Sequence, residues 1–261
     1  MGKTAAELSF LFQSWPREAP ALFGPFHIVM SALSILLPVW IVKASRPLSR
    51  ENCTKRLFHI GITLLVLELF KQAILFFAVN NMHYDFWYFP FQLCSVPMYL
   101  CLVLPGLSDR QKDTVFTFLF DFSLPGAVLA LIYPMDMLRS SAILTMHAFL
   151  WHGFLIYAGL LPFHARLVKA DLKGFRSAAL LYLFLCLIAV GLNCLLDPLA
   201  VYGGRPNLFY LSPLVITGQP VFHEIALRFG ILPGMILYVL SYLLLCFLVH
   251  LLCMRAYKKE L

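Results

Sequence analysis

The sequence predicts an all-α, polytopic membrane protein built as a single bundle of about seven transmembrane helices. Hydrophobic residues make up 61% of the 261 residues and charged residues 13%, whereas a soluble domain carries about a quarter charged residues. Apolar runs of roughly twenty residues, the length of a membrane-spanning helix, recur along nearly the whole chain. Because so few charges are available to cover a water-facing surface, we expect the apolar runs to face lipid and one another.

Proline, glycine and charged residues divide the chain into segments long enough to cross a bilayer. We expect spans near residues 24–43, 57–79, 88–106, 114–133, 141–161, 175–197 and 230–254, all within one transmembrane bundle over 1–261. The segment 198–229 is too often interrupted by glycine and proline to cross the membrane alone. We expect it to form an external loop or an interfacial segment.

The basic residues predict the orientation, because cytoplasmic loops are enriched in Lys and Arg. One set of span ends carries most of them: Lys43, Arg46, Arg50, Lys55, Arg56, Arg110, Lys112, Arg166, Lys169, Lys173, Arg176, Arg255, Lys258 and Lys259. The opposite ends carry Lys3, Arg17, Arg139, Arg205 and Arg228, with the aromatic residues Trp15, Tyr84, Trp87, Tyr88, Tyr133, Tyr202 and Tyr210. We therefore expect a multi-pass protein of the cell membrane with its N-terminus outside and its C-terminus in the cytoplasm.

The span near 57–79 contains Glu68, Lys71 and Gln72, whose i,i+3 and i,i+4 spacing places them on one helical face. An isolated charge in the middle of a membrane costs several kcal/mol, on the order of three or more, so the two charges are expected to neutralise each other. The trio is either an ion pair for helix packing or a polar wall that binds a lipid headgroup or ester.

The span near 88–106 brings an amide, Gln92, and a thiol, Cys94, into apolar surroundings. Pro90 suits the first turn of a helix, and Pro97 is expected to kink the span and free backbone groups near Cys94. Those groups, or Gln92, could stabilise an oxyanion. The alternative is that Cys94 is an inert, buried small hydrophobe.

The next two spans carry Asp121, His147 and His152. Asp121 needs a partner at this depth, and Lys71 or a histidine of span 141–161 would serve. His152, deeper in its span than His147, is the better candidate for a general base. His27 and Asn193 lie towards the outer side, like Gln92 and Cys94, which favours a polar cavity that opens outward.

Neither a disulfide framework nor a cofactor is expected. The seven cysteines form no CxxC pair, and most lie in apolar spans. The net charge of +7 reflects loop residues that orient a membrane protein, so nucleic acid is not an expected partner. A zinc site built from His27, Asp121, His147, His152 and His223 is an alternative whose spacing matches no metal motif.

Short motifs follow one another in a characteristic order: Phe26-His27, Glu68, Phe70-Lys71, Pro90-Phe91-Gln92-Leu93-Cys94, Gly126-Ala127, Leu129-Ala130-Leu131-Ile132-Tyr133-Pro134 and His152. In this order, over residues 24–200, the chain resembles the YwaF-type integral membrane proteins of bacteria. That family is similar to a eukaryotic branch of TMEM-class lysophospholipid acyltransferases. The resemblance implies transfer of a fatty acyl chain to lysophosphatidylethanolamine through a thioester on a membrane cysteine.

One departure from the pattern concerns the nucleophile. In the eukaryotic branch the cysteine directly follows the proline and precedes a histidine, whereas Phe91 and Gln92 hold those positions here. Cys94 comes three residues after Phe91, about one helical turn, so it could reach the same side of the helix from another level. Either Cys94 takes the role, or the nucleophile is absent. Glu68, Lys71 and His152 match the family in residue type.

The preferred hypothesis is acyl transfer to a lysophospholipid in an intramembrane polar cavity. Its catalytic residues would be Cys94 as nucleophile, His152 as base and Asp121 or Glu68 as orienting group. The residues expected to bind membrane phospholipid or lysophospholipid are Glu68, Lys71, Gln72, Gln92, His27, His147 and Asn193. The alternatives are a small-solute or lipid transporter or binding protein without catalytic activity, and an intramembrane metal-dependent lipid hydrolase.

Overall fold

The computed structural model of the protein describes residues 15, 19–134 and 136–259, and all regular structure in these residues is helical. Lys3 and Arg17, which entered the orientation argument, lie outside them. Six helical rods are long and apolar enough to cross a membrane. They are α2 (Pro25–Ala44), α3 with a π-helical end (Arg50–Val79), α5 and α6 joined through a π-helical turn (Asp109–Ile132), α7 (Ala142–His164), α8 (Leu172–Leu196) and α10 (Ile231–Lys259). The predicted all-α membrane bundle is therefore confirmed.

The predicted span 88–106 is helical only in its second half. The short helix α4 (Val96–Val103) and a 3₁₀ turn (Leu104–Gly106) form that half, whereas Phe89–Ser95 has no continuous helix. Pro97 lies in the first turn of α4, where its missing N–H removes no helical hydrogen bond. The expected kink at Pro97 was therefore wrong, because this proline begins a helix instead of bending one.

The rod Asp109–Ile132 contains a π-helical turn at Leu119–Ser123. The backbone N–H of Leu124 donates to Leu119, five residues earlier. Pro125 follows and has no N–H of its own, so the wider turn passes the proline without breaking the rod. Asp121 lies on this turn and is completely buried.

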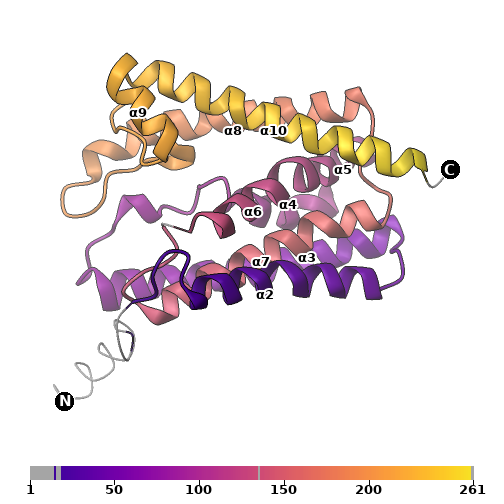
Figure 1. Ribbon diagram of the computed structural model, residues 1–261, viewed down its shortest axis with the longest axis horizontal. Coiled ribbons are helices and arrows are strands. Elements are labelled where there is room, and N and C mark those ends of the chain that lie inside the picture. The colour runs from indigo at the N-terminus through magenta and orange to yellow at the C-terminus, as the bar shows by residue number, and fades with distance from the viewer. Residues whose placement is uncertain (1–14, 16–18, 135, 260–261) are drawn as a thin grey trace.

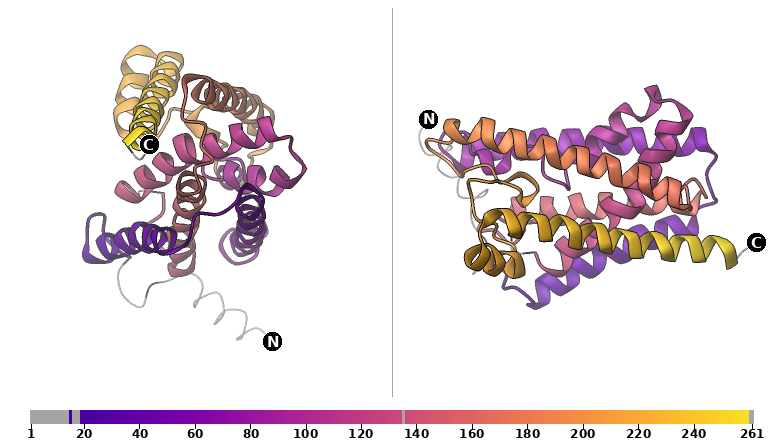
Figure 2. Two further views of the ribbon diagram at one scale, coloured as in Figure 1. Left: turned by 90° about the vertical axis from the view of Figure 1, so that its right-hand side faces the viewer. Right: turned by 90° about the horizontal axis from the view of Figure 1, so that it is seen from above.

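The helices pack around two large cores. The first joins α3, α4, α6 and α7 around Leu57, Met98 and Phe149, and the second joins α8 and α10 to Phe118 and Phe122. In Figure 1, α2, α3 and α7 lie together along one side, and α8, α9 (Pro220–Phe229) and α10 lie along the other. The end-on view in Figure 2 places α10 at the edge of the bundle. Its exposed side chains include Leu232, Leu240, Leu244, Leu248 and Leu252, as expected of a helix that faces lipid.

The loops at one end of the bundle contact one another through aromatic and polar side chains. Trp87 contacts the ring of Tyr210, with 6.0 Å between ring centroids, and His83 stacks on Tyr202 at 4.8 Å. The backbone N–H of Trp87 also donates to Gly204. Several residues of the predicted aromatic belt thus gather at one end, within loops 80–95 and 200–219. Which end faces the cytoplasm stays a prediction.

The segment 198–229 contains no membrane-length helix. It consists of 3₁₀ turns at Asp197–Leu199 and Leu208–Tyr210 and the ten-residue helix α9, which packs on the start of α10. Gly230, with φ of 98°, makes the turn between the two helices, a conformation that favours glycine. The segment lies at one end of the bundle, and its expected place as an external loop or interfacial segment stays a prediction.

Candidate active site

The centre of the candidate site is a hydrogen-bonded trio on α3. Lys71 Nζ donates to Glu68 Oε2 at 2.8 Å, and Gln72 Nε2 donates to Glu68 Oε1 at 2.7 Å. The side chain of Glu68 is 4% exposed and that of Lys71 18%. The Lys71 ammonium also lies 5.9 Å from the ring centroid of Trp151. The predicted neutralisation of the two charges on one face is therefore confirmed.

Helix α7 packs two aromatic side chains against this trio. Its Trp151 donates from Nε1 to the backbone oxygen of Cys94 at 3.0 Å, and its His147 contacts the backbone oxygen of Leu67 through Nε2 at 3.0 Å. The two rings stack with 5.7 Å between centroids. A carbonyl only accepts hydrogen bonds, so His147 carries its proton on Nε2. Trp151 fixes the backbone at Cys94, a role that its residue type alone did not indicate.

Cys94 lies in a tight turn immediately before α4. The backbone N–H of Ser95 donates to Gln92 at 2.8 Å, and the half-buried Cys94 side chain packs against the first core. Trp151, which binds the backbone oxygen of Cys94, has its ring centroid 5.9 Å from the Lys71 ammonium. The turn thus brings Cys94 close to the charged trio without placing it inside a helix.

Gln92 fastens this turn to the distant loop 200–219. Its Oε1 accepts from the backbone N–H of Phe209 at 2.9 Å, and its Nε2 donates to the backbone oxygen of Asn207 at 3.4 Å. Asn193 of α8 binds the same loop by contacting both the N–H and the carbonyl of Leu208. Both amide side chains are occupied by backbone groups in this structure, so their observed contacts are structural.

His152 is buried on α7 one residue after Trp151. Its Nδ1 contacts the backbone oxygen of Ala148 at 2.7 Å, which places the proton on Nδ1 and leaves a lone pair on Nε2. The structure contains no hydrogen bond between His152 and Cys94. The group that orients the ring is the backbone oxygen of Ala148, and not a carboxylate as expected.

Asp121 has a different partner from those predicted. Its Oδ2 lies 2.8 Å from His250 Nδ1, and both side chains are fully buried. His250 Nε2 contacts the backbone oxygen of Asp171 at 3.0 Å. The sequence placed Lys71 or a histidine of α7 beside Asp121. The structure places α10 there, because the π-helical turn carrying Asp121 packs against α10 as well as α7.

His27 connects the start of α2 to α6. The backbone N–H of Phe23 donates to His27 Nδ1 at 2.9 Å, and Nε2 contacts the backbone oxygen of Leu131 at 2.9 Å. Both ring nitrogens are therefore used in packing. No cluster of three or more His, Cys, Asp or Glu side chains within the described ranges could hold a metal ion. His223, for example, contacts Thr217 instead.

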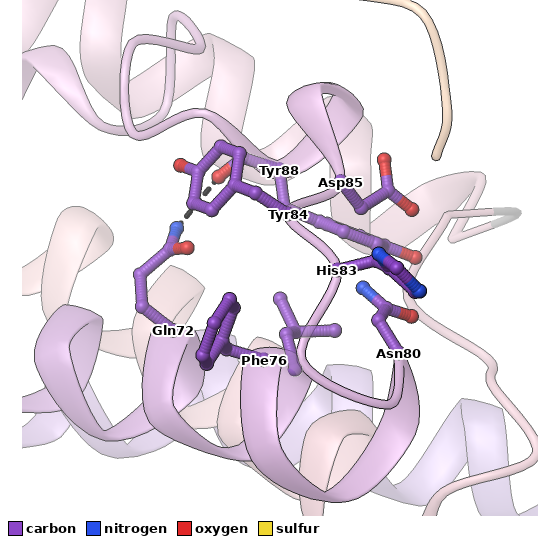
Figure 3. A pocket seen from close by; sticks show the side chains of 8 residues that line it. Gln72, Phe76, Asn80, His83, Tyr84, Asp85 and Tyr88 are labelled. Carbon is purple, nitrogen blue, oxygen red and sulfur yellow. Dashed lines mark hydrogen bonds between the residues drawn. The ribbon is translucent and has the colours of Figure 1, made fainter. Parts of the chain in front are cut away.

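A small crevice lies next to the trio and is lined by one of its members, Gln72. Figure 3 shows Gln72 pointing towards Tyr88, and Gln72 Nε2 donates to the backbone oxygen of Tyr88 at 2.7 Å. Tyr84 and Asp85 lie on the same crevice, with Phe76, Asn80 and His83. Burial, with the negative charges of Glu68 and Asp85, raises the pKa of Tyr84 to about 12, so this phenol keeps its proton at neutral pH.

Comparison with known proteins identifies the family. Residues 22–254 match the family model described as the TMEM164 family. No curated protein and no solved structure matches the chain. The match begins just before α2 and ends in the last turns of α10, so it includes all six long helices and the turn that carries Cys94. The chain is an integral membrane protein that belongs to the TMEM164 family.

Proposed function

We propose that the protein transfers a fatty acyl chain from a phospholipid to a lysophospholipid through a thioester on Cys94. The thiol gives its proton to His152, and the sulfur attacks the ester carbonyl, so that a C–S bond forms. The ester C–O bond then breaks, and the proton returns to the departing alkoxide. In the second half, the hydroxyl of the acceptor gives its proton to His152 and attacks the thioester, so that a new C–O bond forms. The C–S bond then breaks, and the departing thiolate takes the proton from His152.

The observation that carries this proposal is that Trp151 binds the backbone oxygen of Cys94 and also lies beside the half-buried Lys71. The ammonium of Lys71 has three N–H donors, one of which binds Glu68. The other donors are suited to an ester carbonyl and to the oxyanion that replaces it in the transition state. In apolar surroundings such an interaction is stronger than in water. The resemblance to lysophospholipid acyltransferases supports the same chemistry.

His152 is suited to the role of base because its Nε2 carries a lone pair. The hydrogen bond to Ala148 fixes the tautomer, which is the task that a carboxylate performs in other nucleophile–histidine pairs. Contacts between a nucleophile and its base are often long before substrate binds. Asp121 has no part in this proposal, since His250 holds its carboxylate.

The test is acyl transfer by the purified full-length protein in vesicles that contain labelled phosphatidylcholine and lysophosphatidylethanolamine. Cys94→Ala should lose about a thousandfold or more of the rate, as expected when a nucleophile is removed. The wild-type protein should carry labelled acyl chain that hydroxylamine releases, and Cys94→Ala should carry none. Cys101→Ala, a change at a buried cysteine on α4, should transfer normally. Full transfer by Cys94→Ala would exclude the proposal.

A further inference from the structure

A second depression lies beside the crevice and shares Leu75 and Tyr88 with it. This headgroup groove, as we call it, has a volume of about 530 Å³, within the range of sites for small molecules. Its lining consists of Leu75, Val79, Tyr88, Arg139, Ser140, Ser141 and Leu144. One wall is the π-helical end of α3, and the opposite wall is the segment that leads into α7. The groove therefore combines aliphatic walls with one cationic group.

Arg139 is held in place mainly by neutral groups. Its Nε donates to the backbone oxygen of Asp136 at 2.9 Å, and its guanidinium carbon lies 4.4 Å from the ring centroid of Tyr88. Its backbone N–H donates to Thr145 Oγ1, and its backbone oxygen accepts from Trp15 Nε1. Backbone and ring contacts together fix the direction of this side chain before any ligand binds.

No ion pair joins Arg139 to a carboxylate among the described residues. The carboxylate of Asp136 instead accepts from the hydroxyl of Tyr210 at 2.5 Å. Arg205, at the same end of the bundle, differs because Asp197 binds it through two hydrogen bonds of 2.7 and 2.8 Å. Within the part of the chain that the structure describes, Arg139 is thus a preoriented cation that no carboxylate pairs with, and guanidinium groups bind phosphate well through paired N–H donors.

Hydrogen bonds connect the headgroup groove to the candidate active site. Arg139 stacks on Tyr88, the backbone oxygen of Tyr88 accepts from Gln72, and Gln72 binds Glu68, which holds Lys71. Leu75 of the groove lies one helical turn beyond Lys71, about 6 Å along α3 at 1.5 Å per residue. A ligand in the groove would therefore lie next to the helical turn that carries Lys71 and Gln72.

We propose that the headgroup groove binds the phosphate of a phospholipid or lysophospholipid, with Arg139 as the phosphate ligand. The aliphatic walls pack against the glycerol and the first methylenes of the chain, and Tyr88 keeps the guanidinium in position. The use of this site during acyl transfer rests on the proposed function, but binding itself requires no reaction. Free inorganic phosphate has the same anionic chemistry, so the experiment must separate the two.

The experiment measures binding by the ligand-dependent rise in melting temperature of the full-length protein in detergent micelles, with Cys94→Ala to prevent turnover. The probes are lysophosphatidylethanolamine, a monoacylglycerol with the same chain, and inorganic phosphate. Arg139→Ala should weaken lysophosphatidylethanolamine binding by about tenfold or more, as expected for a charge-assisted hydrogen bond. It should leave monoacylglycerol binding unchanged, because that lipid has no phosphate. Tyr88→Leu should weaken binding in the same selective way but by less.

Arg205→Ala is the matched control, since its guanidinium is already neutralised at the same end of the molecule, and it should bind all probes like the parent. Unchanged lysophosphatidylethanolamine binding by both Arg139→Ala and Tyr88→Leu would overturn the proposal. Equal affinity for inorganic phosphate and lysophosphatidylethanolamine would also overturn it, in favour of a free-anion site. Normal binding combined with no acyl transfer by the wild-type protein would refute the proposed function and leave the headgroup groove intact.

Discussion

Two buried carboxylates in the same bundle are neutralised in different ways. Glu68 is paired with Lys71 and Gln72 of its own helix. The i,i+3 and i,i+4 spacing allows this arrangement to be predicted from the sequence. Asp121 is paired with His250, 129 positions away, and no local pattern indicates such a partner. A buried charge that loses its partner costs about 3–5 kcal/mol, so both pairs contribute to the stability of the bundle.

Glu68→Ala leaves the Lys71 ammonium buried without a counter-charge, and we expect a loss of about 3–5 kcal/mol in unfolding free energy. The double variant Glu68→Ala/Lys71→Met should recover much of that loss, because it removes both charges. Thermal unfolding in detergent micelles measures the two effects. Glu51→Ala provides the control, since Glu51 forms an exposed pair with Lys55 on the same helix, and its removal should leave the unfolding free energy nearly unchanged. Equal losses for Glu68→Ala and Glu51→Ala would contradict this account.

At the scale of elements, the approach of α3 to α4 determines where Cys94 lies. A Cβ atom on Gly61 would lie 2.9 Å from the backbone nitrogen of Leu102 and 3.0 Å from the Cβ of Cys101. Glycine therefore permits close contact between α3 and α4, and any larger residue at this position would push the two helices apart. Since the turn 92–95 leads directly into α4, the separation of α3 and α4 also fixes the distance between the thiol and Lys71.

Gly61→Ala should destabilise the protein by about 1–3 kcal/mol through overpacking and should slow acyl transfer by displacing Cys94 from Lys71. Gly191→Ala is the matched control, because nothing lies within 4 Å of the position that its Cβ would take. Alanine there should be neutral or stabilising by up to about 1 kcal/mol, as its higher helix propensity predicts. Thermal unfolding and transfer rates of both variants test the contact. A Gly61→Ala protein with the stability of the Gly191→Ala protein would show that the helices do not meet closely.

At the scale of the whole molecule, the loop 200–219 is fastened to two segments that are far apart in the sequence. Gln92, in the turn before α4, and Asn193, on α8, bind consecutive residues of this loop, Phe209 and Leu208. Phe209 has φ of 56°, a left-handed conformation that is uncommon for a residue with a side chain. These two amide side chains hold the loop in a backbone shape that its own sequence does not favour.

Gln92→Leu should free the amide of Phe209, and the exchange of that amide with solvent deuterium should accelerate by about tenfold, the equivalent of one lost hydrogen bond. Asn193→Leu should accelerate exchange at Leu208 in the same way. Hydrogen exchange measured on the purified protein tests both, with the amides of α2 as an internal reference. Unchanged exchange in Gln92→Leu together with lost acyl transfer would instead assign Gln92 to the reaction.

The sequence predicts the long helices and part of the site. Apolar length defines the six long helices to within a few residues, except that α3 begins at Arg50 and not near 57. Local spacing predicts the Glu68–Lys71–Gln72 trio. Gln92, His27 and Asn193 bind backbone groups that lie 15 to 117 positions away in the chain. The periodicity of apolar and polar residues in the sequence does not predict such distant contacts. Arg139 was considered only as a charge that predicts orientation, because its contacts with Asp136 and Tyr88 are properties of the folded loops.

The half-helical crossing at Phe89–Gly106 has a consequence for which lipids could react. Its helical part is eleven residues long, about 16 Å at 1.5 Å per residue, or half of a bilayer core of about 30 Å. With the membrane surface at Gly106, Cys94 would therefore lie near the midplane, where the irregular part of the crossing meets the helical part. For the proposed chemistry, donor and acceptor would both come from the leaflet on the side of loops 80–95 and 200–219. The protein would then exchange chains among lipids of a single leaflet, and neither lipid would have to cross the membrane.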